Sequence, residues 1–198
     1  MYPTLPPATR ALILANIGVF LLQQVPSLAQ PMLDWFALWP TGSGKFWPWQ
    51  LVTYAFLHGN LLHIFMNMFA LFMFGRALEM YWGGRRLVLF FLVCVLSAAL
   101  TQLLVEGPAG HEPTIGASGG VFGVLLAFAW YFPRQRLFVI PIPIPIPAWL
   151  FVTFYALIEL LYGVTGTEAG VAHFAHLGGM LGALACILYW QARRRFRA

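Results

Sequence analysis

The side chains of this 198-residue chain that could perform chemistry are few, and the most informative ones stand inside apolar sequence. Ionisable or strongly polar residues in such segments are costly, so each is a candidate functional residue. We single out six of them as candidates: His63, Asn67, Ser118, Glu159, His173 and His176. A serine hydroxyl becomes a strong nucleophile when a base accepts its proton, and histidine is a common base. Within this set we expect Ser118 to be a nucleophile and His176 its general base.

Each residue also has a structural interpretation. Ser118 stands among glycines, and small residues line contacts between membrane helices. Asn67 could serve as a hydrogen-bonding link between helices. His173 and His176 could form a metal pair, although their spacing is weak evidence and no cysteine or carboxylate stands close by in sequence. His58 and His111, in outer loops, are expected to be simple surface residues.

The composition places these residues in a membrane. The chain is 61% hydrophobic and only 9% charged, whereas about a quarter of the residues of a soluble domain are charged. Its mean hydropathy is +0.78. Lipid is therefore the main solvent of the folded chain, and the length allows a single membrane domain, residues 1–198, without a separate soluble domain. The net charge of +5 does not indicate nucleic acid, because the basic residues flank apolar segments and form no basic helix.

Six apolar spans predict an all-α membrane protein with a six-helix transmembrane bundle. The spans are residues 9–25, 61–80, 84–105, 117–133, 148–164 and 170–192. Crossing the hydrocarbon takes about 20 residues, so the shorter spans require a thinned bilayer or extension into their flanks. The first span also resembles a signal peptide, an alternative that the charge pattern disfavours.

The basic residues indicate how the spans are oriented. With six spans, ten of the eleven fall on one side: Arg10, Arg76, Arg85, Arg86, Arg134, Arg136, Arg193, Arg194, Arg195 and Arg197. Only Lys45 lies on the other side. The positive-inside rule therefore places both termini in the cytoplasm. At the inner end of the second span, Glu79 can reach the interface beside Arg76.

Two connecting segments have a distinctive composition. The outer segment of residues 26–60 is rich in Trp and Pro, and Trp favours the headgroup level, so we expect this segment to lie in the membrane interface. On the inner side, residues 140–147 alternate Ile with Pro. Proline removes a donor and disfavours helix at the preceding residue, so an extended interfacial strap that acts as a spacer is expected.

Depth brings three of the polar positions into one layer. The second, fourth and sixth spans all enter the membrane from the outer side. At 1.5 Å per residue, His63, Ser118 and His176 lie within about 10 Å of the outer boundary, where water can enter. Asn67 stands four residues after His63, on the same helix face.

Glycines indicate how these spans could meet. Pairs at small-xxx-small spacing are Gly116/Gly120 and Gly119/Gly123 in the fourth span and Gly178/Gly182 in the sixth. Such faces let helix backbones approach closely, which would bring the Ser118 hydroxyl to His176. The Ser118 N–H, near a helix N-terminus, could then join His63 and Asn67 as donors to an oxyanion.

Glu159 is the one carboxylate at a comparable depth. It lies about five residues from the outer end of the fifth span, so depth permits contact with His176. However, no close-packing glycine face ties the fifth span to the sixth at that level, and a membrane carboxylate is more often a structural partner of a polar neighbour. We therefore expect a dyad of Ser118 and His176, with Glu159 as the residue most able to overturn it.

Three motifs in the sequence resemble those of the rhomboid intramembrane serine proteases. Residues 116–119, Gly-Ala-Ser-Gly, resemble the family's G-x-S-G nucleophile motif. Residues 175–179, Ala-His-Leu-Gly-Gly, resemble its A-H-x-G-G base motif, and residues 58–68 resemble its second-helix motif. The match covers a core of about residues 45–185 in the family's order. A lone G-x-S-G is weak evidence, but all three motifs at matching depths are specific.

The resemblance implies a six-helix core and an activity. The expected activity is that of a serine endopeptidase, multi-pass in the cell membrane, which cleaves transmembrane protein substrates near the extracytoplasmic face. The implied site is a dyad without a catalytic carboxylate, and without metal or cofactor. The resemblance further implies a water-filled cavity capped by a loop of about residues 165–169, and a lateral substrate entrance beside the fifth span.

The family's supporting positions map onto this chain residue by residue. His63 and Asn67 stand in the positions that assist the oxyanion, with Gly116 and Gly119 flanking the nucleophile. Phe122 stands four residues after Ser118, where some members have Tyr. Phe lacks the hydroxyl, so only ring packing against His176 is expected of it.

Two other functions are compatible with parts of this pattern. The first is a non-catalytic rhomboid-like protein that binds membrane clients, against which the presence of both Ser118 and His176 argues. The second is a transporter or metal channel that uses His63, His173 and His176. A channel needs a continuous polar track across the membrane, whereas these residues cluster at one depth.

Overall fold

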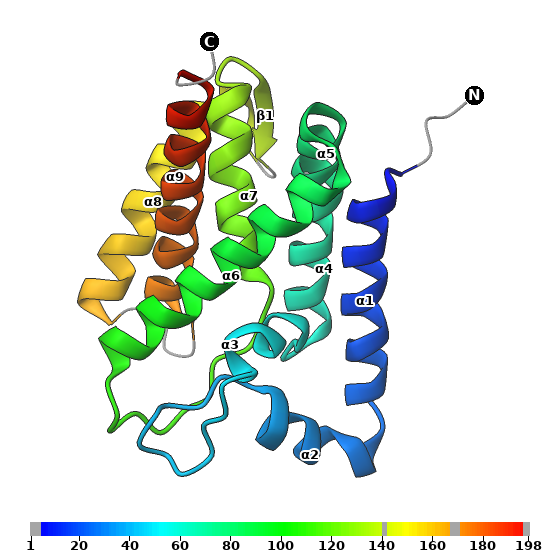
Figure 1. The fold of residues 1–198 in the computed structure, drawn as a ribbon, viewed down its shortest axis with the longest axis vertical. Helices are drawn as coiled ribbons and strands as arrows, with labels where there is room; N and C mark the ends of the chain where they lie inside the picture. Colours follow the sequence, from blue (N-terminus) through cyan, green and yellow to red (C-terminus); the bar gives the residue numbers. More distant parts are fainter. Residues whose placement is uncertain (1–4, 140–141, 167–170, 196–198) are drawn as a thin grey trace.

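In the computed structural model, the described residues are 5–139, 142–166 and 171–195, and helices make up most of them. The α-helices are α1 (Pro7–Gln23), α2 (Pro26–Phe36), α3 (Gln50–Thr53), α4 (Leu61–Ala70), α5 (Arg76–Trp82), α6 (Gly84–Glu106), α7 (Ser118–Tyr131), α8 (Ala148–Thr165) and α9 (His173–Arg195). A 3₁₀ turn, η1 (Tyr54–Phe56), follows α3, and a π-helical segment, η2 (Leu71–Gly75), joins α4 to α5. Figure 1 shows α1, α4, α7, α8 and α9 side by side along the long axis, with α6 crossing them obliquely.

The prediction of a mostly helical membrane protein is confirmed. Within the described residues, the helices long and apolar enough to cross a membrane are Leu61–Trp82, Gly84–Glu106, Ala148–Thr165 and His173–Arg193. The expected spans near the N-terminus and after the nucleophile motif are the shorter apolar helices Pro7–Gln23 and Ser118–Tyr131. With 14 residues, α7 rises about 21 Å, less than the roughly 30 Å of hydrocarbon. The count of six crossings and the side of each terminus remain predictions.

Helix α7 is the centre of the bundle and packs closely on α6 and α9. Most of its residues from Gly119 to Ala129 are buried. A side chain added at Gly119 would collide with Ala98 of α6, and one added at Gly123 would collide with Cys94. A side chain at Gly179 of α9 would overlap the backbone of Gly119. The absence of side chains at these glycines therefore sets the spacing of the three helices.

The glycine pair expected in α9 faces a different helix from the one predicted. Side chains at Gly178 and Gly182 would collide with α6, at Thr101 and Ser97, and not with α7. The Ser97 hydroxyl donates to the Gly178 carbonyl at 2.7 Å. Helix α9 packs on both α6 and α7. The pair Gly178/Gly182 allows its close contact with α6, and the adjacent Gly179 allows its close contact with α7.

A buried carboxylate fixes the start of α1. Glu79 of α5 accepts hydrogen bonds from the Ala8 N–H at 2.8 Å and from the Thr9 N–H and hydroxyl, both at 2.6 Å. It is 5% exposed, so the expectation that it reaches the interface is wrong. The first N–H groups of a helix have no partner within the helix, and the carboxylate satisfies two of them at the positive end of the helix dipole.

The outer segment carries an exposed aromatic cluster and a helix that the sequence analysis did not predict, α2. Trp35, Trp47 and Trp49 stack on one another, with centroids 4.9 to 6.2 Å apart, and all three are exposed. Such an exposed stack is suited to the headgroup layer. The location of this segment in the membrane interface stays a prediction. Pro31 lies inside α2, and the helix continues through it to Phe36.

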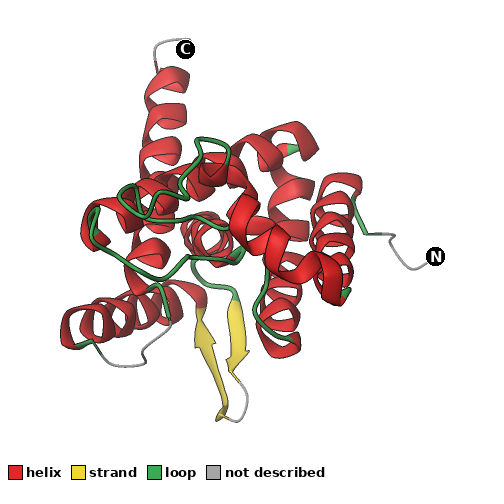
Figure 2. Cartoon of the chain, turned by 90° about the horizontal axis from the view of Figure 1, so that it is seen from below, coloured by secondary structure: helices red, strands yellow, loops and turns green. Residues whose placement is uncertain are grey.

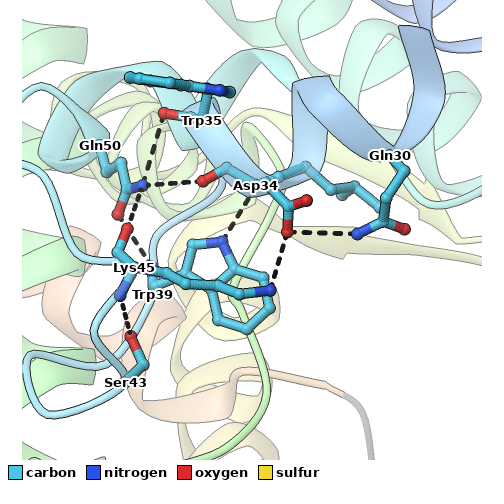
Figure 3. Close-up of polar contacts among 8 residues, drawn as sticks. Gln30, Asp34, Trp35, Trp39, Ser43, Lys45 and Gln50 are labelled. Carbon is cyan, nitrogen blue, oxygen red and sulfur yellow. Dashed lines mark hydrogen bonds and ion pairs between the residues drawn. The ribbon is translucent and has the colours of Figure 1, made fainter. Parts of the chain in front are cut away.

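Gln50 ties this segment together (Figure 3). Its fully buried side-chain amide donates to the Lys45 carbonyl at 2.9 Å and more weakly to the Trp35 and Asp34 carbonyls at 3.4 Å. Its carbonyl oxygen accepts from the Trp39 N–H at 3.2 Å. One side chain thereby holds the end of α2 against the start of α3.

The Ile-Pro segment is extended, as predicted, but it is one arm of a hairpin. Strand β2 (Ile142–Pro147) pairs antiparallel with β1 (Arg136–Val139), a partner that the sequence analysis did not identify. Residues 140 and 141 of the expected strap lie outside the described residues. Figure 2 shows the hairpin extending away from the helices. A two-stranded hairpin tolerates prolines because outward-facing N–H groups have no strand to pair with.

The cap that Glu79 provides predicts a loss of stability on its removal. Glu79→Ala should lower the free energy of unfolding by about 2–4 kcal/mol, because it leaves buried N–H groups without an acceptor. Unfolding in detergent micelles measures this loss. Glu112→Ala, at an exposed position, is the matched control and should change little. Equal losses in the two variants would contradict the cap.

Candidate active site

The first turn of α7 and the first turn of α9 bring Ser118 and His176 together. Ser118 is the first residue of α7, and His176 lies three residues into α9. The Ser118 Oγ lies 2.8 Å from the His176 Nε2, a hydrogen-bonding distance. The contact joins residues 58 positions apart in sequence. It depends on the glycine contact between the two helices, since Gly119 and Gly179 lie next to these side chains.

Phe122 fixes the plane of the His176 ring. The two rings are stacked, with centroids 4.2 Å apart and planes within 8°. Phe122 is one turn after Ser118, so α7 supplies both the hydroxyl and the ring that packs on the imidazole. Tyr155 of α8 in turn contacts Phe122, at a centroid distance of 4.9 Å. The ring packing expected of Phe122 is therefore present.

Glu159 lies in the same cluster, and the expectation that it has no route to His176 is wrong. Its Oε2 is 2.9 Å from the His176 Nδ1 and 2.7 Å from the His173 Nδ1. Both contacts are shielded from solvent, because Glu159, His173 and His176 are 5%, 6% and 9% exposed.

A single glycine explains how α8 reaches α9. A Cβ at Gly163 would lie 3.0 Å from the Phe174 ring and 3.3 Å from the His173 Cβ. Gly163 stands one turn after Glu159 and has no second glycine four residues away, so the pattern of paired glycines does not reveal it. Glu159 and Gly163 on one helix face were the signal that could have identified the contact.

Glu159, His173 and His176 could in principle hold a metal ion, since one ligand atom from each lies within 4.8 Å of the others. The observed separations argue for hydrogen bonds instead. Zinc bonds of about 2.1 Å at tetrahedral angles hold ligand atoms about 3.4 Å apart. The two contacts to the Glu159 Oε2, at 2.7 and 2.9 Å, are shorter than that.

The His63 ring and the Ser118 hydroxyl both lie close to Gly116. A Cβ at Gly116 would lie 2.7 Å from the His63 Cε1 and Nε2 and 3.7 Å from the Ser118 Oγ. Gly116 has a φ of +123°, which side chains rarely adopt, and its N–H donates to the Tyr54 carbonyl at 2.9 Å. The missing side chain therefore lets the His63 ring approach Gly116 closely, beside the Ser118 hydroxyl.

Asn67 lies one turn deeper in α4 and is buried. Its amide donates to the His63 carbonyl at 3.0 Å. In the hydrogen bonds of the described residues it therefore supports His63 and is not joined to Ser118. The predicted cap at about residues 165–169 lies mostly outside the described residues, which omit 167–170.

His58 is buried, so the expectation of a surface residue is wrong for it, although His111 is exposed. Its ring meets that of His63 edge-on, with centroids 5.0 Å apart. Burial, together with the neighbouring His63, lowers the pKa of His58 to about 4. His58 is therefore neutral at physiological pH, and its ring packs against that of His63.

Comparison with known proteins supports the resemblance to the rhomboid family. Residues 45–193 match the Rhomboid domain family. A presenilin-associated rhomboid-like protein, mitochondrial, of Bos taurus is 30% identical over 183 residues, 90% of this chain and 47% of the relative. Rhomboid protease GlpG of Klebsiella pneumoniae is 34% identical over 125 residues, 63% of this chain and 43% of the relative. Rhomboid protein 1, mitochondrial, of Saccharomyces cerevisiae is 30% identical over 188 residues, 88% of this chain and 51% of the relative. The chain spans about half the length of the curated relatives it matches.

The burial of His58 predicts a pH dependence of stability. Its pKa of about 4 in the folded chain lies below the ordinary value of about 6.5, so the unfolded chain takes up the proton first. The stabilisation is present above pH 6.5 and is lost as the pH falls toward 4, by about 2 kcal/mol between pH 7 and 4.5.

His58→Gln cannot take up this proton, so its stability should fall less steeply over that range when unfolding is followed in detergent micelles. His111→Gln, at an exposed position, should keep the wild-type slope. If His58→Gln and wild type show the same slope, His58 does not titrate as described.

Proposed function

The chain belongs to the rhomboid family, and on that premise we propose that it is an intramembrane serine endopeptidase that hydrolyses peptide bonds in or near transmembrane segments. Ser118 is the nucleophile and His176 the general base. The observation that carries the proposal is the 2.8 Å contact between the Ser118 Oγ and the His176 Nε2, inside a chain whose helices are long and apolar enough to cross a membrane. A hydroxyl hydrogen-bonded to an imidazole in an apolar bundle is suited to acyl transfer.

The reaction follows from this contact. The Ser118 Oγ attacks the scissile carbonyl carbon while the His176 Nε2 takes the hydroxyl proton. As the C–N bond breaks, His176 gives that proton to the leaving amine, and an ester to Ser118 remains. A water molecule then attacks the ester, with His176 again accepting a proton, and the carboxylic acid product leaves as the Ser118 hydroxyl is restored.

The tetrahedral intermediate carries a negative oxygen that needs donors. The Ser118 N–H, at the start of α7, is one candidate, because the first N–H groups of a helix have no partner within it. The His63 ring, across Gly116, is the second. Asn67 is the third, and its contact with the His63 carbonyl supports the placement of that histidine. Each donor is worth about 3 kcal/mol of transition-state stabilisation.

The substrates we propose are transmembrane proteins. A protease needs an extended peptide, whereas a transmembrane helix hides its backbone, so small or helix-breaking residues near the cut lower the cost of unwinding. We further propose six spans with cytoplasmic termini, and in that arrangement the site would lie near the extracytoplasmic face of the cell membrane. Ten basic residues on one side of the predicted spans support that orientation.

The role of Ser118 predicts a near-complete loss of turnover on its removal. Ser118→Ala should lower the cleavage rate of transmembrane substrates in liposomes by about 10³-fold or more, because no nucleophile remains. Ser27→Ala, at an exposed position in α2, is the matched control and should cleave as wild type does. Unchanged turnover in Ser118→Ala, or none in wild type across a substrate panel, would contradict the proposal and favour a client-binding protein.

The close approach of the His63 ring to Gly116 predicts that a side chain at position 116 lowers the protease activity. Gly116→Ala places a methyl group against the His63 ring and should reduce the cleavage rate more than about tenfold by moving that donor. Gly107→Ala is the control, since Gly107 also has a positive φ but nothing within 4 Å of its Cβ position. Both variants carry backbone strain, so only Gly116→Ala should lose activity. Equal cleavage rates in the two variants would argue against a role for the position of the His63 ring beside Gly116.

A further inference from the structure

We propose that Glu159 is a positioning residue for His176 and that His173 holds the Glu159 carboxylate in place. The site would then be an array of Ser118, His176, Glu159 and His173. This inference rests on the proposed function, and it departs from the dyad without a carboxylate that the family resemblance implies.

The first argument is the tautomer of His176. Its Nε2 lies 2.8 Å from the Ser118 Oγ, and its Nδ1 lies 2.9 Å from the Glu159 Oε2. A neutral imidazole has one N–H and one acceptor nitrogen. A carboxylate only accepts, so it selects the form with hydrogen on Nδ1, and this leaves Nε2 free to accept the serine proton. That is the form a general base requires.

The second argument is that Glu159 is itself fixed. Its Oε2 is also 2.7 Å from the His173 Nδ1. One carboxylate oxygen has two lone-pair sites, so it can accept from both imidazoles at once. Rotation of the carboxylate would break both bonds in a buried site, where unpaired polar groups are costly. The Tyr162 ring further meets the His173 ring edge-on, at a centroid distance of 5.7 Å.

The third argument is the placement of Glu159 on its helix. In α8 the buried residues are Ala148, Val152 and Glu159, so Glu159 is the one buried side chain in the second half of that helix. Burying a carboxylate in a membrane helix is costly unless polar partners bind it, so the orientation of α8 indicates that the partners of Glu159 stabilise it. Gly163, one turn later, gives α8 the close approach to α9 that this requires.

The test begins with a readout that does not depend on protease activity. In protein labelled with ¹⁵N-histidine, in micelles, the His176 ring should carry its hydrogen on Nδ1, and Glu159→Gln should remove this preference. Glu159→Asp, which keeps the carboxylate, should retain more of it. His176 signals that are the same in wild type and in Glu159→Gln would overturn the proposal. A tautomer change in a protein that cleaves no substrate would support the array and reject the proposed function, so the two failures are distinguishable.

The second readout is the rate of reaction with a fluorophosphonate probe between pH 5 and 9. The titratable groups around His176 are Glu159 of α8, His173 of α9 and His63 of α4. Glu159→Gln should react about 10²-fold or more slowly, and the acid limb of its profile should move to lower pH, because the imidazolium loses its carboxylate partner. Glu159→Asp should recover part of the rate. A residue with a structural role alone would leave the midpoint of the limb unchanged, and an unchanged midpoint would overturn the proposal.

Two controls complete the experiment. Glu106→Gln makes the same chemical change at the end of α6 and should leave both readouts unchanged. Titration with zinc separates the array from a metal site. Stoichiometric zinc binding that requires Glu159, His173 and His176 would overturn the hydrogen-bonded array, whereas the array predicts no such binding.

Discussion

The rest of this structure depends on the direct contact of two helix backbones at Gly119 of α7 and Gly179 of α9. Without a hydrophobic driving force between helices in lipid, close backbone packing is a main source of association. A side chain at Gly179 would overlap the Gly119 backbone, so this contact tolerates no larger residue. Ser118 precedes one glycine and His176 lies three residues before the other. The contact therefore sets the 2.8 Å separation of hydroxyl and imidazole.

Two buried carboxylates serve polar groups on neighbouring helices of the bundle. Glu79 accepts hydrogen bonds from the first N–H groups of α1, and Glu159 lies within hydrogen-bonding distance of the His173 and His176 rings. In each case a carboxylate from one helix serves groups on another, which is how buried charge is tolerated away from water. The difference between the two lies in their neighbours. Glu79 contacts backbone and a threonine, whereas Glu159 leads through His176 to a serine hydroxyl.

Much of the fold and part of the site could be predicted from the sequence. Long apolar spans gave α4–α5, α6, α8 and α9 within a few residues, because hydropathy over about 20 residues is a strong signal. The Ile-Pro repeat identified an extended segment, because each proline lacks a backbone donor and disfavours helix at the residue before it. The meeting of Ser118 with His176 followed from the motifs, whereas the α9 glycine pair expected to bring them together contacts α6, and Gly179 makes the contact with α7. What was missed depends on contacts between distant segments: the strand β1, the cap by Glu79, the burial of His58, and the approach of α8 through Gly163 alone.

The central claim, that Ser118 is a nucleophile activated by His176, is tested most directly by mapping the covalent adduct of a fluorophosphonate by mass spectrometry. The chain has four serines, which makes the assignment unambiguous. The account predicts an adduct on Ser118, none on Ser27, Ser43 or Ser97, and loss of the adduct in His176→Ala. An adduct on another serine, or one on Ser118 that forms as fast without His176, would contradict it.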